Sequence, residues 1–488
     1  MDAVQKANQY IREKRTEVVD EYRNHFHLMA PVGWINDPNG FIYFRGEYHL
    51  FYQFYPYDSV WGPMHWGHAK SKDLLHWEEL PVALAPGESY DKDGCFSGSA
   101  IEKDGKLYLM YTGHTVVGEQ VRQVQCLAVS EDGIVFKKYA QNPIIAEEHI
   151  ADVAQIDDFR DPKVFQREGH FYSVVAAKTA ESRGQILLFE SEDLLEWQFS
   201  SVLLEGDDEQ GVMWECPDLF HLDGKDVLIL SPIEMDKKGL SYWNTSSTVA
   251  FIGAVDWQTG RFIVENHHEI DHGVDFYAPQ TCLGKEDKRI MVAWMQMWHR
   301  TMPTHDLGHK WSGSMTLPRE LFVEKNRLLQ RPIQTLYQSL DITLQKENLE
   351  LSEQPIILEK VISDQTYAAL SIAMNDAQEV ALLFGHGGNT LEFHYSAEES
   401  LVTVSRKNSG WKISGNEEET YDFRCMRVPL VDGKLKVEIV RDTSSMEWFF
   451  NDSTAMSFTF YEKSKGHDLM LSASDRAVLT SIKIGEIQ

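Results

Sequence analysis

Three acidic side chains stand beside or two residues before a proline, at Asp37-Pro38, Asp161-Pro162 and Glu215-Cys216-Pro217. A proline favours extended geometry in its neighbour and removes a donor from the strand ladder, which predicts a strand entry that aims the acidic side chain inward. Two carboxylates that converge on an uncharged, aromatic-edged pocket have the groups needed to cleave a glycosidic bond. One must be ionised to attack the anomeric carbon, and the other must hold a proton for the departing oxygen. A third carboxylate bound to sugar hydroxyls would stabilise the transition state.

Each acidic residue alone is better explained as a turn former, because Asp and Pro are both common in turns. Three at one position of a repeat are harder to explain in that way. The residue pattern leaves open which carboxylate plays which role.

These residues begin copies of a repeated segment, which is a short apolar strand, a polar turn and an aromatic-rich strand. Five copies occur, at 39–53, 98–113, 161–176, 217–232 and 279–294. In the second and fifth copies, Cys95-Phe96-Ser97-Gly98 and Asp275-Phe276-Tyr277-Ala278-Pro279 occupy the place of the acidic segments.

A second phrase recurs out of step with the first, at intervals of about sixty residues. It reads SKDLLHW at 71–77, SEDGIVF at 130–136 and SEDLLEW at 191–197. Together the phrases give about four strands per unit in about five units, which predicts a five-bladed β-propeller. Residues at equivalent repeat positions then converge on the central channel. An ordinary β-sandwich would explain the strands but not the repeated phrases.

The repeats end near residue 340, and the remaining chain alternates apolar and polar residues in short strands, which favours a β-sandwich. We therefore predict an all-β protein, a five-bladed β-propeller followed by a C-terminal β-sandwich. The predicted divisions are a helical cap at 1–24, the propeller at 25–335, a linker at 336–349 and the sandwich at 350–488.

The composition limits the partners and the location of the protein. Its 46 basic and 75 acidic residues give a net charge of −29, which disfavours nucleic acid and anionic membranes. The cysteines are odd in number and form no CxxC pair, so we expect neither a disulfide framework nor a zinc site. Residues 1–22 have no apolar core of a signal peptide, and no stretch has the length of a membrane span, which predicts a cytoplasmic protein. The sandwich domain could mediate a homodimer.

Several segments resemble glycoside hydrolase family 32, which contains invertases, sucrose-6-phosphate hydrolases, inulinases and levanases. The resemblance is dense from residue 25 to about 335 and thinner in the sandwich, where it rests on 441–449. The matching segments are 25–27, 33–40, 61–69, 95–100, 159–164, 213–218, 275–280 and 311–320.

The resemblance implies a β-fructofuranosidase that acts with retention and needs no cofactor or metal. Asp37 is then the nucleophile, Glu215 the acid/base, and Asp161 the residue that binds the fructosyl 3- and 4-hydroxyls. The expected substrates are sucrose, sucrose 6-phosphate or short fructo-oligosaccharides. The implied contacts to the fructosyl unit come from Asn36, Gln53, Trp61, Phe96, Ser97, Arg160 and Trp294.

One position departs from the family pattern. Tyr55 stands where the family commonly has Asn, which predicts a reshaped pocket on the leaving-group side.

Other features allow other interpretations. His65 and His68 form an HxxH without a third ligand, which is more often core histidine than a metal site. A basic cluster at 299–310, with His299, Arg300, His305, His309 and Lys310, is either a solvated loop, which we favour, or a grip on a substrate phosphate. A non-catalytic fructan-binding propeller and a transfructosylase remain as alternatives. The first would need neither Asp37 nor Glu215, and the second would share every catalytic residue.

Overall fold

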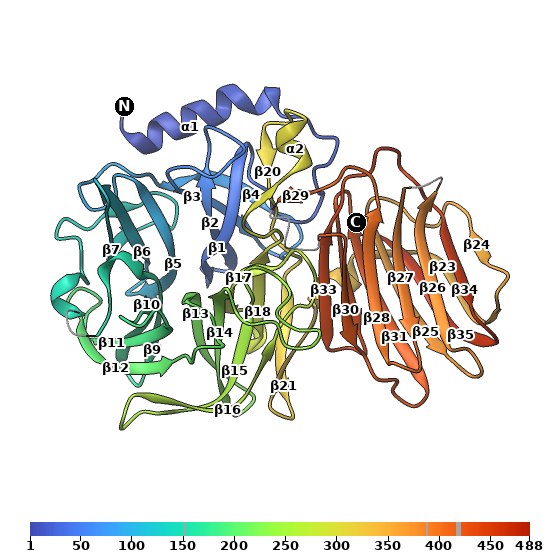
Figure 1. The fold of residues 1–488 in the computed structure, drawn as a ribbon. Helices are drawn as coiled ribbons and strands as arrows, with labels where there is room; N and C mark the ends of the chain where they lie inside the picture. Colours follow the sequence, from blue (N-terminus) through green and yellow to red (C-terminus); the bar gives the residue numbers. More distant parts are fainter. Residues whose placement is uncertain (151–152, 387–388, 416–420) are drawn as a thin grey trace.

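The computed structural model describes residues 1–150, 153–386, 389–415 and 421–488. Five sheets surround a centre, and two further sheets pack beside them, as Figure 1 shows in blue to yellow and in orange to red. This arrangement confirms the predicted propeller and sandwich. Within the described ranges, no helix is both long enough and apolar enough to cross a membrane.

Each propeller sheet is a blade of four antiparallel strands, which are consecutive in the chain in blades 1 to 4. Blade 1 gains a fifth strand from residues 311–312, and blade 5 takes its last two strands from residues 319–332. Blade 1 contains β1 Gly33–Phe44, β2 Glu47–Tyr55, β3 His65–Ser71, β4 Glu78–Leu84 and the parallel β20 Trp311–Ser312. Blade 2 contains β5 Gly94–Lys103, β6 Lys106–Val117, β7 Gln120–Ser130 and β8 Lys137–Lys138. Blade 3 contains β9 Phe159–Arg167, β10 His170–Lys178, β11 Gly184–Ser191 and β12 Gln198–Glu205. Blade 4 contains β13 Met213–Leu222, β14 Lys225–Ile233, β15 Val249–Asp256 and β16 Arg261–Glu269. Blade 5 contains β17 Tyr277–Leu283, β18 Arg289–Trp294, β21 Arg319–Glu324 and β22 Arg327–Pro332.

The first strands of the blades form a closed ring. β1 contacts β5, β5 contacts β9, β9 contacts β13, β13 contacts β17, and β17 contacts β1. Ring closure leaves no open inner edge. It also brings the starts of the five repeats to one channel, as their spacing predicted.

The SxD phrases are turns between the third and fourth strands of the first three blades. In blade 1 the Ser71 hydroxyl accepts from the backbone N–H of Leu74 at 2.8 Å, and Asp73 accepts from Leu75 at 3.0 Å. Blades 2 and 3 repeat both bonds. Leu74, Gly133 and Leu194 adopt φ of 70°, 78° and 75°, so the repeated letters encode one turn geometry.

The sandwich has two six-stranded sheets around an apolar core centred on Trp448. One sheet has the order β23 Leu340–Leu351, β35 Ala477–Ile487, β25 Thr366–Ala373, β31 Lys434–Asp442, β32 Ser445–Phe450 and β33 Thr454–Thr459. The other has the order β24 Ile356–Leu358, β34 Leu469–Ala473, β26 Glu379–His386, β27 Asn389–Ser396, β28 Leu401–Asn408 and β30 Phe423–Arg427. A short pair, β19 Arg300–Thr301 and β29 Ser414–Gly415, joins the two parts of the chain.

The helical elements are few and short. They are α1 Ala3–Lys14, α2 Pro303–Asp306, α3 Gln334–Gln338 and the 3₁₀ turns η1 Arg15–Glu17, η2 Glu147–His149, η3 Ile156–Asp158 and η4 Lys285–Asp287. α1 packs against β4, where Asn8 accepts a backbone hydrogen bond from Val82 at 3.0 Å. The predicted linker at 336–349 is wrong, because most of it is β23, whose 12 residues pair along β35. Leu344, Leu349 and Leu351 of this strand pack on the sandwich core at the sheet edge.

Buried ion pairs join the propeller to the sandwich. Arg319 of β21 binds Glu447 of β32, and His27 lies 2.8 Å from both Asp442 and Glu447. Burial opposes a charge on His27, but these two carboxylates raise its pKa to about 9. Asp275, the acidic residue of the fifth repeat, also lies here, bound to Arg300 of β19 at 2.6 Å and to Arg406 of β28. Asp275 therefore joins the two domains and does not face the channel.

Candidate active site

Every first strand of the propeller pairs irregularly with its second strand near its beginning. The ladder skips residues between Ile35 and Pro38, Phe96 and Gly98, Arg160 and Lys163, Glu215 and Asp218, and Tyr277 and Gln280. A β-bulge re-aims side chains that a regular strand would hold in its pleat. The repeated bulge explains why Asp37, Ser97 and Asp161, all in skipped segments, turn to the channel.

The backbone at these bulges is left-handed in three blades. Asp161, Cys216 and Ala278, each directly before a proline, have φ of 65°, 48° and 50°. The expectation that proline would make its neighbour extended is wrong for Asp161. The bulge imposes a conformation that Asp tolerates better than most side chains.

A cavity of about 500 Å³ opens at this end of the channel, within the size range of small-molecule sites. It collects nine of the ten predicted site residues: Asn36, Asp37, Gln53, Trp61, Phe96, Ser97, Arg160, Asp161 and Glu215. The tenth, Trp294, lies outside its lining and is fully buried. Trp294 packs against Trp34 and Trp298, with ring centroids 5.7 and 4.9 Å away. Trp298, which sequence reasoning missed, lines the cavity.

Asp37 is held by neutral donors. Ser97 donates its hydroxyl to Oδ2 at 2.8 Å, and Asn36 donates its amide to Oδ1 at 3.1 Å. Trp34 donates in turn to the Asn36 carbonyl oxygen at 2.7 Å, which fixes the amide orientation. Burial and the charge of Glu215 raise the pKa of Asp37 to about 6, against these donors. An ionised Asp37 is therefore a poorly solvated, reactive carboxylate at neutral pH.

Asp161 shares a donor residue with Asp37. Cys216 donates its backbone N–H to Oδ2 of Asp161 at 2.9 Å, and its thiol lies 3.5 Å from that oxygen and 3.6 Å from Oδ2 of Asp37. Burial raises the pKa of the Cys216 thiol well above its usual value, so the thiol stays protonated. Burial also raises the pKa of Asp161, opposed by Arg160 and reinforced by Glu215 and Asp37.

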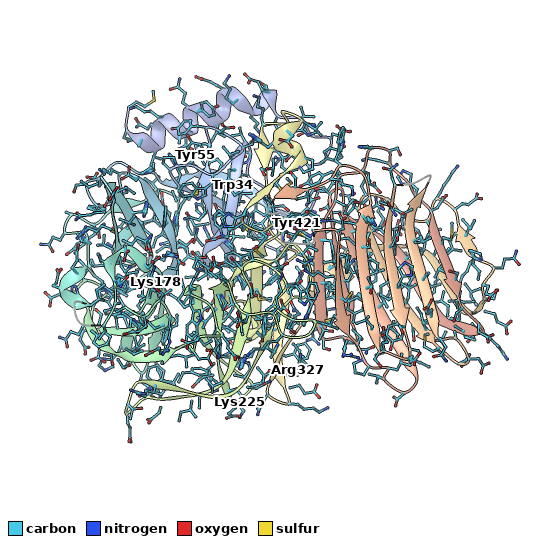
Figure 2. The ribbon with its side chains drawn as sticks, in the orientation of Figure 1. Trp34, Tyr55, Lys178, Lys225, Arg327 and Tyr421 are labelled. Carbon is cyan, nitrogen blue, oxygen red and sulfur yellow. The ribbon has the colours of Figure 1, made fainter. Side chains whose placement is uncertain are left out.

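Glu215 is held by a cation and a phenol. Arg160 donates to Oε1 through Nε at 3.1 Å and Nη2 at 3.0 Å, and the hydroxyl of Tyr277 donates to Oε2. Arg160 also binds Asp158 at 2.8 Å and Gln123 at 3.2 Å. Lys178 pairs with Asp158 behind it, and Figure 2 labels Lys178 on the third blade. These contacts fix the Glu215 carboxyl in one position at the cavity wall.

One side of the cavity is aromatic. Phe96 and His114 stack with centroids 4.1 Å apart, and Trp61 meets Phe96 edge-on at 6.1 Å. Burial lowers the pKa of His114 to about 4, so it is neutral at physiological pH. Trp61 is 47% exposed, which leaves its ring open to a sugar face.

Sequence reasoning missed Tyr277, Cys216, His114, Gln123 and Asp158 as site residues. Two of them could have been found, because Cys216 follows Glu215 directly and Tyr277 lies at the start of the fifth repeat. His114 and Gln123 come from the strands behind the first strand of blade 2, where the repeat gives no signal.

The remaining predicted features lie elsewhere. Tyr55 is not part of the cavity lining. Its backbone pairs with that of Trp34 on blade 1, and its ring centroid lies 5.6 Å from that of Tyr57. Figure 2 labels Trp34 and Tyr55. Tyr55 therefore does not reshape the leaving-group side of the pocket through direct contact with the cavity. None of the five residues of the basic cluster lines the cavity, and Arg300 is bound to Asp275.

The histidines of the HxxH have ordinary partners. His65 lies 3.0 Å from the carbonyl oxygen of Pro63, and His68 lies 3.0 Å from His49. In the described part of the chain, no group of three or more His, Cys, Asp or Glu side chains is arranged to hold a metal. All five cysteines are free.

Comparison with known proteins gives two family matches. The glycosyl hydrolases family 32 N-terminal domain matches residues 27–332, and the family 32 C-terminal domain matches residues 328–486.

Individual relatives match along nearly the whole chain. A sucrose-6-phosphate hydrolase of Escherichia coli is 38% identical, with 97% of this chain and 96% of that protein covered. A raffinose invertase of Escherichia coli is 37% identical, with 93% of each covered. The structure of a Bombyx mori GH32 β-fructofuranosidase superimposes with a TM-score of 0.85 at 34% identity, covering 100% of this chain and 98% of that one. A mutant of the same Bombyx mori protein was solved in complex with sucrose.

Proposed function

The chain belongs to glycosyl hydrolase family 32 and is a β-fructofuranosidase, and we propose that it cleaves sucrose and sucrose 6-phosphate with retention through a covalent fructosyl-enzyme. The observation that carries the mechanism is the convergence of Asp37, Asp161 and Glu215 on one cavity, each held by a different set of donors.

Asp37 is the proposed nucleophile. Ser97 and Asn36 hold its two oxygens, and no cation of the described residues is hydrogen-bonded to them, so the carboxylate is oriented while its nucleophilicity is kept. Its oxygen attacks the anomeric carbon of the fructosyl unit, and the bond to the bridging oxygen breaks.

Glu215 is the proposed acid/base. Glu215 is partly exposed at the cavity wall, whereas Asp37 and Asp161 are buried, so it can reach a leaving group near solvent. It gives a proton to the departing oxygen and then takes one from the water that attacks the fructosyl-enzyme, which frees Asp37.

Asp161 is the proposed hydroxyl-binding residue. Cys216 and Arg160 fix and balance its carboxylate, and the left-handed bulge points it at the channel. Hydrogen bonds from two adjacent sugar hydroxyls to this carboxylate strengthen as the ring becomes oxocarbenium-like. The roles of all three residues follow those that the family resemblance implies.

The test is Asp37→Asn, assayed by release of glucose and fructose from sucrose. We expect a loss of about 10⁴-fold or more in kcat, because the covalent route needs the ionised oxygen. Asp132→Asn, in an exposed turn of blade 2, is the matched control and should keep full activity. Unchanged sucrose hydrolysis by Asp37→Asn would refute the nucleophile.

Retention and the acid role have separate tests. Methanol present during turnover should trap the fructosyl unit as the methyl β-fructofuranoside, and the α product would contradict retention. Glu215→Ala should lose far more rate on sucrose than on a fructoside whose leaving group needs no proton. Equal losses on the two substrates would remove the acid role.

Two alternatives share the fold. A non-catalytic fructan-binding propeller would bind sucrose in calorimetry without turnover, but it would need neither Asp37 nor Glu215. A transfructosylase would use the same residues, and product analysis at high sucrose separates it from a hydrolase. Short fructo-oligosaccharides are a further proposed substrate, compared through kcat/KM with sucrose and sucrose 6-phosphate.

We also propose a cytoplasmic location, which the five free thiols support because thiols persist in reducing compartments. The predicted homodimer stays a prediction. Light scattering on the purified protein tests it.

A further inference from the structure

A second cavity, of about 680 Å³, opens at the other end of the propeller channel. The active-site cavity is lined by residues at the beginnings of the first strands, such as Asp37 and Asp161. This second cavity, which we call the lower cavity, is lined by residues further along the same strands, such as Phe41 of β1, Phe165 of β9 and Phe220 of β13. It is therefore a separate site, and nothing in the proposed mechanism uses it.

The lower cavity combines apolar walls with cations. Phe41, Phe165, Phe220, Leu219, Val255 and Trp257 provide its apolar surface. Lys163, Arg167 and Arg289 also line it, beside one carboxylate, Asp226, in a protein whose net charge is −29. A concentration of cations in an acidic protein is a local feature that its overall charge does not explain.

Two of these cations have a carboxylate partner. Lys163 binds Asp218 at 2.9 Å and the carbonyl oxygen of Thr281 at 2.8 Å. Arg167 pairs with Glu168 at 2.6 Å and lies over the Trp257 ring, with Cζ 4.3 Å from the centroid. Their charges are therefore largely balanced.

Arg289 has no such ion pair. Within the described ranges no carboxylate forms an ion pair with it, and its Nε is buried without a hydrogen-bond partner. Its one hydrogen bond to a described residue runs from Nη1 to the hydroxyl of Thr281, at 3.5 Å. Burial lowers the pKa of Arg289, and the nearby charge of Asp218 opposes that shift, so this cation is poorly solvated and only partly compensated.

The guanidinium of Arg289 is already oriented for a ligand. Its Cζ lies 4.7 Å from the centroid of the Phe220 ring, so an aromatic ring supports it. A guanidinium supported in this way can offer two parallel N–H donors to a carboxylate or phosphate.

We propose that the lower cavity binds a small organic anion, a carboxylate or phosphate monoester with an apolar body, with Arg289 on the anionic group and the aromatic walls on the body. The apolar walls disfavour a fully hydrated inorganic ion, and a buried cation without an ion pair disfavours a purely apolar ligand. A single anionic group matches Arg289, the one lysine or arginine in the described lining of the lower cavity without an ion pair.

Isothermal titration calorimetry on the full chain tests the proposal with phenyl phosphate and benzoate as probes. Saturating fructose in every titration keeps the probes out of the active site. We expect one molecule of phenyl phosphate or benzoate to bind per chain. Phenol and inorganic phosphate should each bind more weakly, because phenol lacks the anionic group and inorganic phosphate lacks the apolar body. Whichever of the two anions binds more tightly identifies the anionic group.

Arg289→Met should weaken probe binding about 10- to 100-fold, the range for loss of charge-assisted hydrogen bonds. Arg331→Met is the matched control, because Arg331 also lies over a phenylalanine, Phe322, but on the surface and paired with Glu320 at 3.0 Å. It should bind the probes like the unaltered chain. Arg289→Lys keeps the charge but loses the paired guanidinium donors. Its affinity for the probes should therefore lie between those of the unaltered chain and of Arg289→Met.

Undiminished sucrose hydrolysis by Arg289→Met would show that the variant is folded. The proposal is overturned if neither anion binds in the presence of fructose, if Arg289→Met binds as tightly as the unaltered chain, or if phenol binds as tightly as phenyl phosphate. These outcomes leave the proposed catalytic roles untouched, since sucrose hydrolysis is measured separately.

Discussion

Arg160 holds a single oxygen of Glu215 with two of its nitrogens, Nε at 3.1 Å and Nη2 at 3.0 Å. The same guanidinium is anchored by Asp158 at 2.8 Å, so the orientation of Glu215 depends on a chain of contacts from blade 3 to blade 4. The position of the proposed acid/base is therefore set by a residue from a neighbouring blade.

Removing this cation should affect both rate and pH dependence. We expect Arg160→Met to lower kcat about 10²-fold, because two charge-assisted hydrogen bonds to Glu215 are lost. The charge of Arg160 also opposes the raised pKa of Asp161, so the acidic limb of the kcat/KM profile should move to higher pH. Arg183→Met, which removes an exposed arginine of the same blade paired with Asp208, is the control for both measurements. A changed rate with an unmoved pH limb would contradict the electrostatic role.

Tyr277 is the second donor to Glu215 and can be tested alone. Tyr277→Phe should lower kcat about tenfold through the loss of one hydrogen bond to a charged group, with KM changed little. Tyr111→Phe removes a similar buried bond, from Tyr111 to Asp91 at 2.8 Å in blade 2, and should reduce stability without reducing kcat. If KM rose while kcat held, Tyr277 would act on substrate binding instead.

Much of the fold could be predicted because its signals are local. The SxD phrases recur because each encodes the same turn. The hydroxyls of Ser71, Ser130 and Ser191 each accept from the backbone N–H three residues later. The repeated hairpins likewise place Asp37, Asp161 and Glu215 at equivalent strand starts, which was enough to predict that they share a cavity.

What could not be predicted depends on long-range packing. Trp294 ends β18 and is buried between Trp34 and Trp298, while Trp298 lies in the following loop and reaches the cavity. Strand periodicity does not say which of two nearby tryptophans the loop will carry outward. The role of Asp275 was hidden for the same reason, since its partner Arg406 lies 131 residues away in the sandwich.

The raised pKa of Asp37 predicts a limit on activity at low pH. An attacking carboxylate must be ionised, so kcat/KM should fall as Asp37 takes up a proton near pH 6, and Asp161, whose pKa burial also raises, contributes to the same acidic limb. The Ser97 hydroxyl stabilises the ionised form, and Ser97→Ala should therefore move this limb to higher pH. Ser99→Ala, at a buried serine bound to the carbonyl oxygen of Pro162, should leave the limb in place. If the acidic limb of the kcat/KM profile stayed at the same pH in Ser97→Ala, a group other than Asp37 would control it.

The same carboxylate should make the native protein less stable than it could be. A folded-state pKa of about 6, above the ordinary value of 3.8, means that the unfolded chain ionises first as pH rises. The unfavourable effect is absent below pH of about 4, grows between about 4 and 6, and then stays constant at about 3 kcal/mol. Asp37→Asn should therefore raise the free energy of unfolding at pH 7 while abolishing turnover, and the gain should vanish near pH 4.

Urea unfolding of both proteins at pH 4, 5, 6 and 7 measures this difference. Asp132→Asn is the control, because the charge of Asp132 should act on stability in the opposite direction. Backbone N–H groups lower the pKa of Asp132, so its charge favours the folded state. That variant should be no more stable than the unaltered chain at pH 7. A stability gain in Asp37→Asn that is equal at all four pH values would mean that packing or lost hydrogen bonds, and not the charge of Asp37, govern the stability of the site.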